Sequence, residues 1–327
     1  MTTRPAARPR ITRRAVHGVL LLDKDAGVSS NAALQRAKRL YRAEKAGHTG
    51  TLDPLASGLL PLCFGAATKF AQASLDADKR YLATLRLGVT TTTGDLEGEV
   101  VSQVADVAVD RAALDAACAG FVGAIEQVPP MHSALKRDGR PLYEYARAGI
   151  ELERAPRPVR IDWLRVVDGE GDLWTIDVAC SKGTYIRTLA EDIGAALGCG
   201  AHLAALRRIA SGALALRSAV TFSALDELDE AALDTHLLSP DSLVASLPRV
   251  VLSSDDAGRF LAGVRRRLPL ADAEAVRVYG PAQGAFLGTG HVVSGELIAT
   301  RLLSPAEVGH LVAAARSPLP VSESLTA

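Results

Sequence analysis

The feature that most constrains this 327-residue chain is a glycine-rich stretch that leads into an apolar run. Residues 47–58 read Gly-His-Thr-Gly-Thr-Leu-Asp-Pro-Leu-Ala-Ser-Gly, and residues 59–65 read Leu-Leu-Pro-Leu-Cys-Phe-Gly. Glycine adopts backbone conformations that other residues avoid, and small hydroxyl residues favour turns. The stretch therefore predicts an irregular loop of defined shape, followed by a buried strand.

Asp53 is the candidate functional residue of this loop. Pro54 disfavours helical geometry at the preceding residue, so we expect Asp53 to be extended with its carboxylate projecting. An ionisable group on a shaped loop beside a buried strand is a candidate for chemistry. The alternative is an Asx-type turn in which Asp53 only caps its own backbone, and spacing alone leaves both interpretations open.

Composition sets broad limits on the class of protein. Hydrophobic residues make up 48% and charged residues 23% of the chain, which is typical of a soluble globular protein with one large and one smaller domain. The formal net charge is zero, so a basic binding face must be balanced by acidic surface elsewhere. No signal peptide or membrane-spanning run is evident, and we expect a cytoplasmic protein. The cysteines are predicted to be buried, reduced thiols: Cys63, Cys118, Cys180 and Cys199.

Apolar patterning predicts the secondary structure. Strands are expected at 18–24, 79–88, 159–167 and 173–180, and in the C-terminal part at 275–279, 285–291 and 297–303. Helices are expected after Ser29 or Ser30, at 66–75, after Asp110, at 141–148, from 186 to 197 and near 255–264. Strands and helices alternate in no regular βαβ rhythm. The sequence therefore predicts an α+β fold, with a mixed or antiparallel sheet and flanking helices.

Composition shifts along the chain predict four segments. Residues 1–14 hold five arginines and no acid, which predicts a disordered basic arm. Residues 15–249 form the main domain and include an acidic helical linker from about 225. Residues 250–315 form a small β unit, and 316–327 are a tail. A unit of this kind binds a ligand or polymer, or serves as a stabilising cap; the sequence leaves both open.

Five motifs that occur in order along the chain carry more information than the spacing of residue types. They are residues 47–65, Lys79-Arg80-Tyr81, 131–136 (Met-His-Ser-Ala-Leu-Lys), 180–188 (Cys-Ser-Lys-Gly-Thr-Tyr-Ile-Arg-Thr) and 200–203 (Gly-Ala-His-Leu). Together they closely resemble the TruB family of bacterial tRNA pseudouridine synthases, which act on uridine 55 of the T loop. The resemblance runs from about Gly18 to about Val220. It continues more loosely through the C-terminal unit, which is similar to a small PUA-like RNA-binding domain.

The resemblance implies an isomerisation that breaks the N-glycosidic bond, turns the base and rejoins it through carbon 5. Nothing is exchanged with an outside reagent, so no cofactor and no metal are expected. The resemblance places the catalytic carboxylate on Asp53 and a charge-holding cation on Arg187. Without it, Arg187 is an ordinary helix-surface arginine.

A base inside a folded RNA loop must be flipped out of its stack to react. By resemblance Tyr81 stacks on the target base and assists proton removal, Tyr185 contacts the substrate, and Leu206 makes an apolar contact beside the base. His48 matches the residue that occupies the space the base leaves. Without the resemblance, Tyr81 is a tyrosine at the rim of a strand, His48 is a loop histidine and Leu206 is a core leucine. Four lysines are further candidates for phosphate contacts: Lys24, Lys69, Lys136 and Lys182.

The expected partner is the T stem-loop of tRNA, with no membrane and no obligate protein partner, and the expected state is a monomer. A different class of function remains as the alternative: a tRNA-binding or folding protein that keeps the fold without depending on catalysis. A hydrolase using His48 and Asp53 is a weaker alternative, because no serine or cysteine nucleophile accompanies them. The sequence leaves open whether Asp53 attacks the ribose or the base, or whether the glycosidic bond breaks by elimination.

Overall fold

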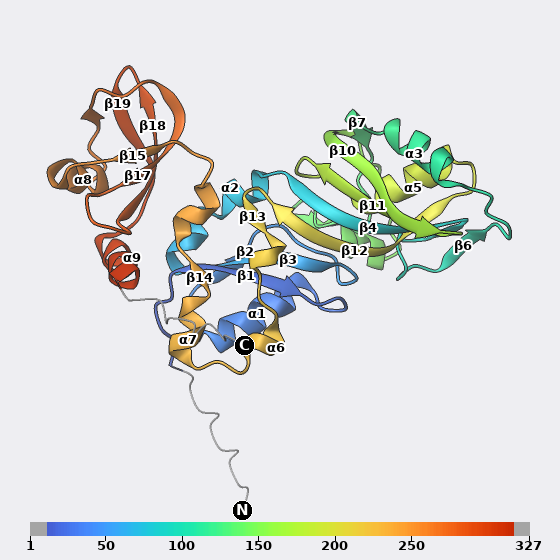
Figure 1. Cartoon of the computed structure of the whole chain (residues 1–327), viewed down its shortest axis with the longest axis horizontal. Coiled ribbons are helices and arrows are strands. Elements are labelled where there is room, and N and C mark those ends of the chain that lie inside the picture. The colour runs from blue at the N-terminus through green and yellow to red at the C-terminus, as the bar shows by residue number, and fades with distance from the viewer. Residues whose placement is uncertain (1–11, 317–327) are drawn as a thin grey trace, which may run out of the picture.

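A ten-stranded mixed sheet forms the larger part of the computed structural model, which describes residues 12–316 (Figure 1). Its main order is β14-β1-β3-β12-β4-β11-β10-β7, with β2 paired to β3 and β13 to β12. Every pair is antiparallel except β12 with β3. The predicted mixed or antiparallel sheet is confirmed. Its strands are β1 Gly18–Lys24, β2 Ala46–His48, β3 Ser57–Phe64, β4 Lys79–Leu87, β7 Gly123–Gln127, β10 Arg157–Glu170, β11 Leu173–Cys180, β12 Ala201–Ser211, β13 Leu214–Ala215 and β14 Leu237–Leu238.

Strands β1 and β3 are buried on both faces, which explains their unbroken apolar sequences. Leu20 and Leu22 belong to the large core under the helices, whereas Val19 and Leu21 belong to a second core on the opposite face. Their register pairs Lys24 with Gly58, so the end of β1 lies beside the loop that carries Asp53.

Helices cover the sheet and begin at the expected caps. The Ser29 side chain accepts a hydrogen bond from the Ala32 amide at the start of α1, and Asp110 caps α3 in the same way. The helix expected at 141–148 spans Leu142–Arg147, and Pro141 occupies the cap position before it. The helices of this part are α1 Ser30–Leu40, η1 Gly65–Lys69, α2 Ala71–Asp76, α3 Arg111–Ala119, α4 Leu142–Arg147, α5 Ile186–Ala196, η2 Leu216–Ser218, α6 Phe222–Leu225, α7 Glu230–Thr235 and η3 Pro240–Val244.

Strand β12 was not predicted, although it lies between β3 and β4 in the sheet. Register shifts between Leu203 and Ala205, and again between Arg208 and Ala210, break its side-chain alternation. Two adjacent arginines further obscure the apolar pattern. The strand's position therefore depends on pairing with neighbours that are distant in sequence.

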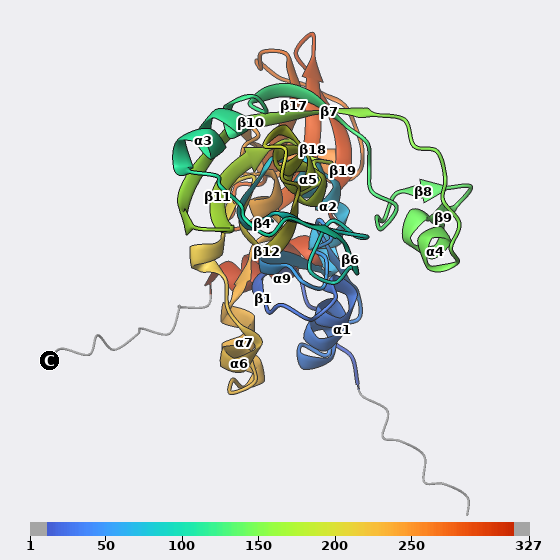
Figure 2. The same ribbon diagram turned by 90° about the vertical axis from the view of Figure 1, so that its right-hand side faces the viewer.

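Two small hairpins project from the large sheet. One pairs β5 Val89–Thr91 with β6 Val100–Gln103, and the other pairs β8 Lys136–Arg137 with β9 Arg140–Pro141. The second hairpin and α4 stand to one side of the sheet (Figure 2). The segment before this hairpin, residues 128–135, lacks regular structure, because two prolines disfavour helix there.

The C-terminal unit is a five-stranded sheet in the order β15-β17-β18-β19-β16. It has its own core around Phe260 and shares a second core with the large sheet, where the Phe70 and Phe286 rings lie 5.0 Å apart. An ion pair of 2.6 Å joins Lys69 to Glu307 at the same junction. Helix α9 was not predicted. The elements are β15 Arg249–Val251, α8 Ser254–Leu261, β16 Arg266–Arg267, β17 Ala273–Tyr279, β18 Phe286–Val293, β19 Glu296–Leu302 and α9 Pro305–Arg316.

The expected basic arm lies mostly outside the described residues, as does most of the expected tail. Arg14 is the last residue of that arm. Its guanidinium donates to the Asp234 carboxylate at 2.6 Å, and its backbone forms an isolated parallel β-bridge with Ala43. No helix in residues 12–316 is long and apolar enough to cross a bilayer. The four cysteines are free; Cys199 is partly exposed, unlike the buried thiol expected from the sequence.

Candidate active site

The loop that carries Asp53 is tied down on both sides of that residue. The Ser30 hydroxyl donates to the Leu52 carbonyl at 2.9 Å and accepts from the Leu52 amide at 2.8 Å. The Gly27 amide donates to the Pro54 carbonyl at 2.7 Å. These bonds satisfy buried backbone groups of an irregular segment, so the loop has one shape.

Lys24 supports the same loop from below. Its ammonium donates to the carbonyls of Val28 at 2.6 Å and Asp25 at 2.9 Å, and it lies 3.5 Å from the Pro54 carbonyl. The side chain is 1% exposed, and burial lowers the pKa of Lys24 to about 8. Lys24 is therefore not available to bind a phosphate, contrary to the sequence prediction.

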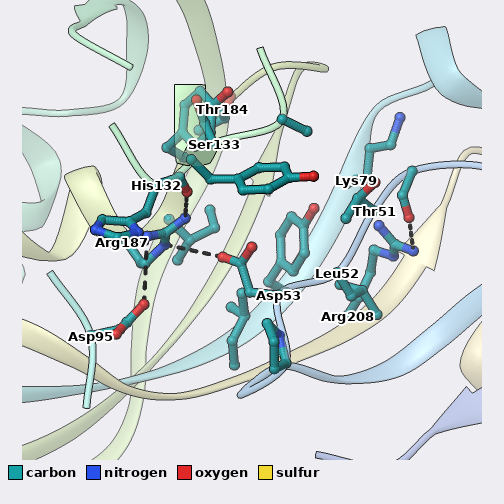
Figure 3. A pocket seen from close by; sticks show the side chains of 18 of the residues that line it. Thr51, Leu52, Asp53, Lys79, Asp95, His132, Ser133, Thr184, Arg187 and Arg208 are labelled. Atoms are coloured by element: carbon teal, nitrogen blue, oxygen red, sulfur yellow. Dashed lines mark hydrogen bonds and ion pairs between the residues drawn. The ribbon is translucent and has the colours of Figure 1, made fainter. Parts of the chain in front are cut away.

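Arg187 provides the cation that faces Asp53. Its Nε lies 3.0 Å from Asp53 Oδ2, and its Nη1 lies 3.5 Å from Asp95 Oδ2 (Figure 3). Two backbone carbonyls accept its other bonds, His132 at 2.7 Å and Thr93 at 3.2 Å. The side chain is 5% exposed, so Arg187 is not the helix-surface arginine of the alternative interpretation. A planar guanidinium with this many partners has one orientation.

Arg187 takes its position from the start of α5. The Gln127 side chain accepts from the Tyr185 amide at 3.0 Å and donates to the Tyr185 carbonyl at 3.2 Å, which fixes the residue before the helix. Two residues later Arg187 enters the first turn. Gln127 is 3% exposed, and this role was not predicted from the sequence.

The Asp53 carboxylate is directed towards the pocket and Arg187. Its side chain is 38% exposed. Burial raises the pKa of Asp53 above its ordinary value, and the Arg187 guanidinium opposes that rise, while the nearby Asp95 charge adds to it. Asp53 is thus a partly desolvated carboxylate in contact with the Arg187 cation, which agrees with its prediction as a candidate for chemistry.

A pocket of about 610 Å³ surrounds these groups. Of the predicted site residues, five line it: Asp53, Tyr81, Tyr185, Arg187 and Leu206. His48 is not among the lining residues. It ends β2, and its Nδ1 is buried without a hydrogen-bond partner. The fold therefore brings together all the predicted residues except His48.

Two aromatic rings flank the pocket. Tyr81 projects from β4, directly opposite Arg208 of β12, and Tyr185 precedes α5. Burial raises the pKa of both phenols, so each is a neutral hydroxyl at physiological pH. Two rings and the apolar side chain of Leu206 provide surfaces on which a planar base can stack.

Sequence reasoning missed two charged residues of the site. Asp95 is 3% exposed; it accepts from the Thr93 hydroxyl at 2.5 Å and from the Glu97 amide at 3.1 Å. Arg208 is 1% exposed and lies on the unpredicted strand β12. The run of threonines before Gly94 is typical of a polar turn. Nothing in the sequence indicated that Asp95 reaches Arg187.

Most of the lysines near the site already have partners. Lys79 donates to the carbonyls of Ser74, Leu75 and Ala77, and burial lowers its pKa to about 8. Lys182 pairs with Asp76 at 2.7 Å. Of the four lysines predicted to contact phosphates, Lys136 has no salt bridge within the described part of the chain and is exposed. Residues 12–316 contain no group of three or more His, Cys, Asp or Glu placed to hold a metal ion.

The fold is similar to that of two chains in solved complexes. A chain of an H/ACA RNP bound to a substrate RNA containing 2′-deoxyuridine superposes with a TM-score of 0.68 at 23% identity, over 89% of this chain and 86% of that chain. A chain of a Cbf5-Nop10-Gar1 complex gives 0.68 at 24% identity, over 89% and 87%. These similarities show the fold alone, a large mixed sheet with a C-terminal β unit.

Family models identify the chain more closely. The N-terminal domain of TruB family pseudouridylate synthases matches residues 38–186, and two C-terminal domain models of tRNA pseudouridylate synthase B and pseudouridine synthase II TruB match 187–245 and 248–303. The chain belongs to the TruB family of pseudouridine synthases and is an isomerase.

Curated relatives agree with this assignment along nearly the whole chain. A tRNA pseudouridine synthase B of Verminephrobacter eiseniae is 55% identical over 94% of this chain and 95% of its own length. Proteins of the same name from Burkholderia mallei and Cupriavidus pinatubonensis are each 57% identical, over 93% and 90% of this chain and 99% and 96% of their own.

Proposed function

We propose that this chain converts uridine 55 in the T loop of tRNA to pseudouridine, with Asp53 as the catalytic carboxylate. The observation that carries the proposal is the contact between Asp53 and the buried Arg187 in the wall of a pocket large enough for a nucleoside. Support for the substrate comes from the relatives, which are named as tRNA pseudouridine synthases.

The chemistry needs an ionised carboxylate aimed at one place. Burial raises the pKa of Asp53 and so favours its protonated form. The Arg187 charge opposes this rise, and its fixed orientation aims the carboxylate. The carboxylate then assists cleavage of the N-glycosidic bond, by attack on ribose or base or by stabilising the charge of an elimination. The freed base turns in the pocket and rejoins the ribose through carbon 5. Carbon 5 loses its proton, and N1, released from the ribose, takes one up.

The pocket fits a base that has left its stack. Tyr81 and Tyr185 provide ring faces, and Leu206 closes the apolar side. In this proposal Tyr81 stacks on the uracil and assists removal of the proton, and Tyr185 contacts the nucleotide. His48, outside the pocket, fills the space in the RNA that the flipped base leaves. No cofactor enters the balance of the reaction.

The remaining features of the proposal follow from this substrate. The partner is the T stem-loop of tRNA, the working unit is a monomer, and the compartment is the cytoplasm, where tRNA is modified. The C-terminal unit, residues 250–315, is proposed to bind RNA outside the loop. The non-catalytic alternative, a tRNA-binding or folding protein, has no use for a carboxylate held against a buried guanidinium.

Release of tritium from tRNA labelled at carbon 5 of uridine tests the proposal, because carbon 5 must lose its hydrogen when the new bond forms. The expected result is release of one tritium per tRNA, lost when uridine 55 is replaced by cytidine. Tight binding of the tRNA without release would instead support the binding protein. Release that persists in the replaced tRNA would move the target to another uridine.

A further inference from the structure

Arg208 is a buried charge in the pocket wall, and none of the described acidic residues pairs with it. Its Nε donates to the Leu59 carbonyl at 2.7 Å, and its Nη2 donates to the Gly50 carbonyl at 3.0 Å. Within residues 12–316 it forms no salt bridge, in contrast to its neighbour Arg207, which pairs with Asp23 at 2.7 Å. A buried guanidinium without a carboxylate is costly unless hydrogen-bond acceptors satisfy its N–H groups, and here backbone carbonyls do so.

The two carbonyls that Arg208 binds lie on either side of Asp53 in the chain. Gly50 precedes Asp53 by three residues, and Leu59 follows it in β3. The Arg208 backbone also pairs with Gly58, where a Cβ atom would lie 2.4 Å from the Arg208 carbonyl oxygen. Arg208 therefore attaches both ends of the Asp53 loop to β12.

The same strand position fixes the loop relative to Tyr81. Arg208 and Tyr81 are direct cross-strand partners, so their side chains lie on the same face of the sheet. Arg208, Tyr81 and Gly50 all line the pocket. The groups facing Tyr81 are Arg208 from β12, Cys180 from β11 and Asp53 from the loop; Arg208 is the cation among them, and it lowers the pKa of Tyr81 against the effect of burial.

We propose that Arg208 is a positioning residue that holds the Gly50–Leu59 loop, and with it the Asp53 carboxylate, at a fixed place relative to the Tyr81 ring. This inference rests on the proposed role of Asp53. It gives strand β12, which was not predicted, a function in the reaction: β12 carries a side chain that hydrogen-bonds to both ends of the loop.

Arg208→Gln tests this inference, with Arg207→Gln as the matched control on the same strand. We expect the single-turnover rate of tritium release at saturating tRNA to fall by roughly ten- to a hundredfold in Arg208→Gln, because small misplacements of reacting groups are costly. The tRNA dissociation constant should change by less than about threefold, since phosphates dominate affinity. Arg207→Gln should behave as the wild type in both measurements.

Glycine variants provide a test that keeps the buried charge. In Gly50→Ala, the new Cβ would lie 3.1 Å from Arg208 Nη1 and push the guanidinium by a few tenths of an ångström, whereas in Gly198→Ala nothing lies within 4 Å. Both glycines have a left-handed backbone, φ +79° and +76°, so both variants carry the same backbone strain. We expect Gly50→Ala alone to slow the single-turnover rate, by about tenfold.

A spectroscopic measurement separates positioning from general loss of structure. The absorbance titration of Tyr81, obtained as wild type minus Tyr81→Phe, should move to higher pH in Arg208→Gln and stay in place in Arg207→Gln. The inference is overturned if Arg208→Gln and Gly50→Ala turn over within twofold of their controls. It is equally overturned if rate, affinity and melting temperature all fall together while the Tyr81 titration is unmoved. Absence of release by the wild type would instead count against the proposed function itself.

Discussion

Arg187 and Arg208 are both buried in the pocket wall, and they differ in what they bind. Arg187 contacts two carboxylates, Asp53 and Asp95, and two carbonyls. Arg208 contacts two carbonyls and no carboxylate in the described chain. Figure 3 shows the two on opposite sides of Asp53. The first arginine controls the charge of the candidate catalytic group, whereas the second controls the shape of the loop that carries it.

Arg187 and Arg208 have different partners because different groups are buried around each of them. Around Arg187 the burial of several acids would otherwise favour protonation; burial raises the pKa of Glu191 as well as that of Asp53. Around Arg208 the buried groups are backbone carbonyls of a loop with little regular structure. A guanidinium meets either need, because it has five donors in one plane.

Asp53→Asn is the change with the largest expected effect, because it removes the charge at the Arg187 side and keeps the shape. We expect the rate of tritium release to fall by at least about a thousandfold, since no other carboxylate in the pocket is aimed at the same place. Affinity for tRNA should remain, because phosphate contacts supply most of it. Release and affinity are measured on the same folded variant, and near-normal release would refute the role of Asp53.

Arg187→Lys tests whether a positive charge beside Asp53 is enough for catalysis, or whether the geometry of the guanidinium is also needed. Lysine keeps the positive charge but cannot reach the acceptors of the planar fork, which are two carboxylates and the carbonyls of Thr93 and His132. We expect single-turnover release to slow by about a hundredfold, because the carboxylate loses its fixed orientation. A rate within threefold of wild type would mean that the charge, and not the geometry, is what Asp53 needs.

Asp95→Asn should have a smaller effect, because Asp53 keeps its own contact with Arg187. The variant removes a buried charge 3.5 Å from the guanidinium. We expect the single-turnover rate to fall by about tenfold and the free energy of unfolding by about 1–3 kcal/mol. Chemical denaturation and tritium release measure the two. Glu97→Gln is the control, since Glu97 is an exposed acid of the same pocket.

The pH dependence gives the smallest and most specific effect. The folded-state pKa of Asp53 lies above its ordinary value, so release should rise with pH through that raised pKa as the carboxylate ionises. The folded state binds this proton more tightly than the unfolded state does. The contribution of Asp53 to stability is therefore greatest at low pH and falls as pH rises through the same window.

Rate and stability should thus change in opposite directions across this window, and Asp53→Asn should abolish the stability change. Asp95→Asn should shift the acid limb of the rate to lower pH, because the Asp95 charge raises the pKa of Asp53. Single-turnover rates and denaturation curves at matched pH values measure both. An acid limb at or below the ordinary aspartate value would contradict the burial argument.

The sequence by itself determined the local features of this protein. Apolar runs placed β1, β4 and β11 within a few residues, serine and aspartate caps marked the starts of α1 and α3, and Pro54 and the glycines predicted the shaped loop. These features depend on residues that are adjacent in the sequence, so they can be predicted from the sequence alone. The motifs that resemble the TruB family also located five of the residues that line the pocket.

Only the tertiary structure decided which charges meet in the pocket. Asp95 reaches Arg187 across 92 positions of sequence, and Arg208 reaches Gly50 across 158. Strand β12 has two register shifts and two adjacent arginines. Its place in the sheet is set only by its pairing with β3 and β4. A charge near a pocket can be solvated, paired with an acid or bound to carbonyls. The choice depends on burial and on distant partners, which no local pattern of residues contains.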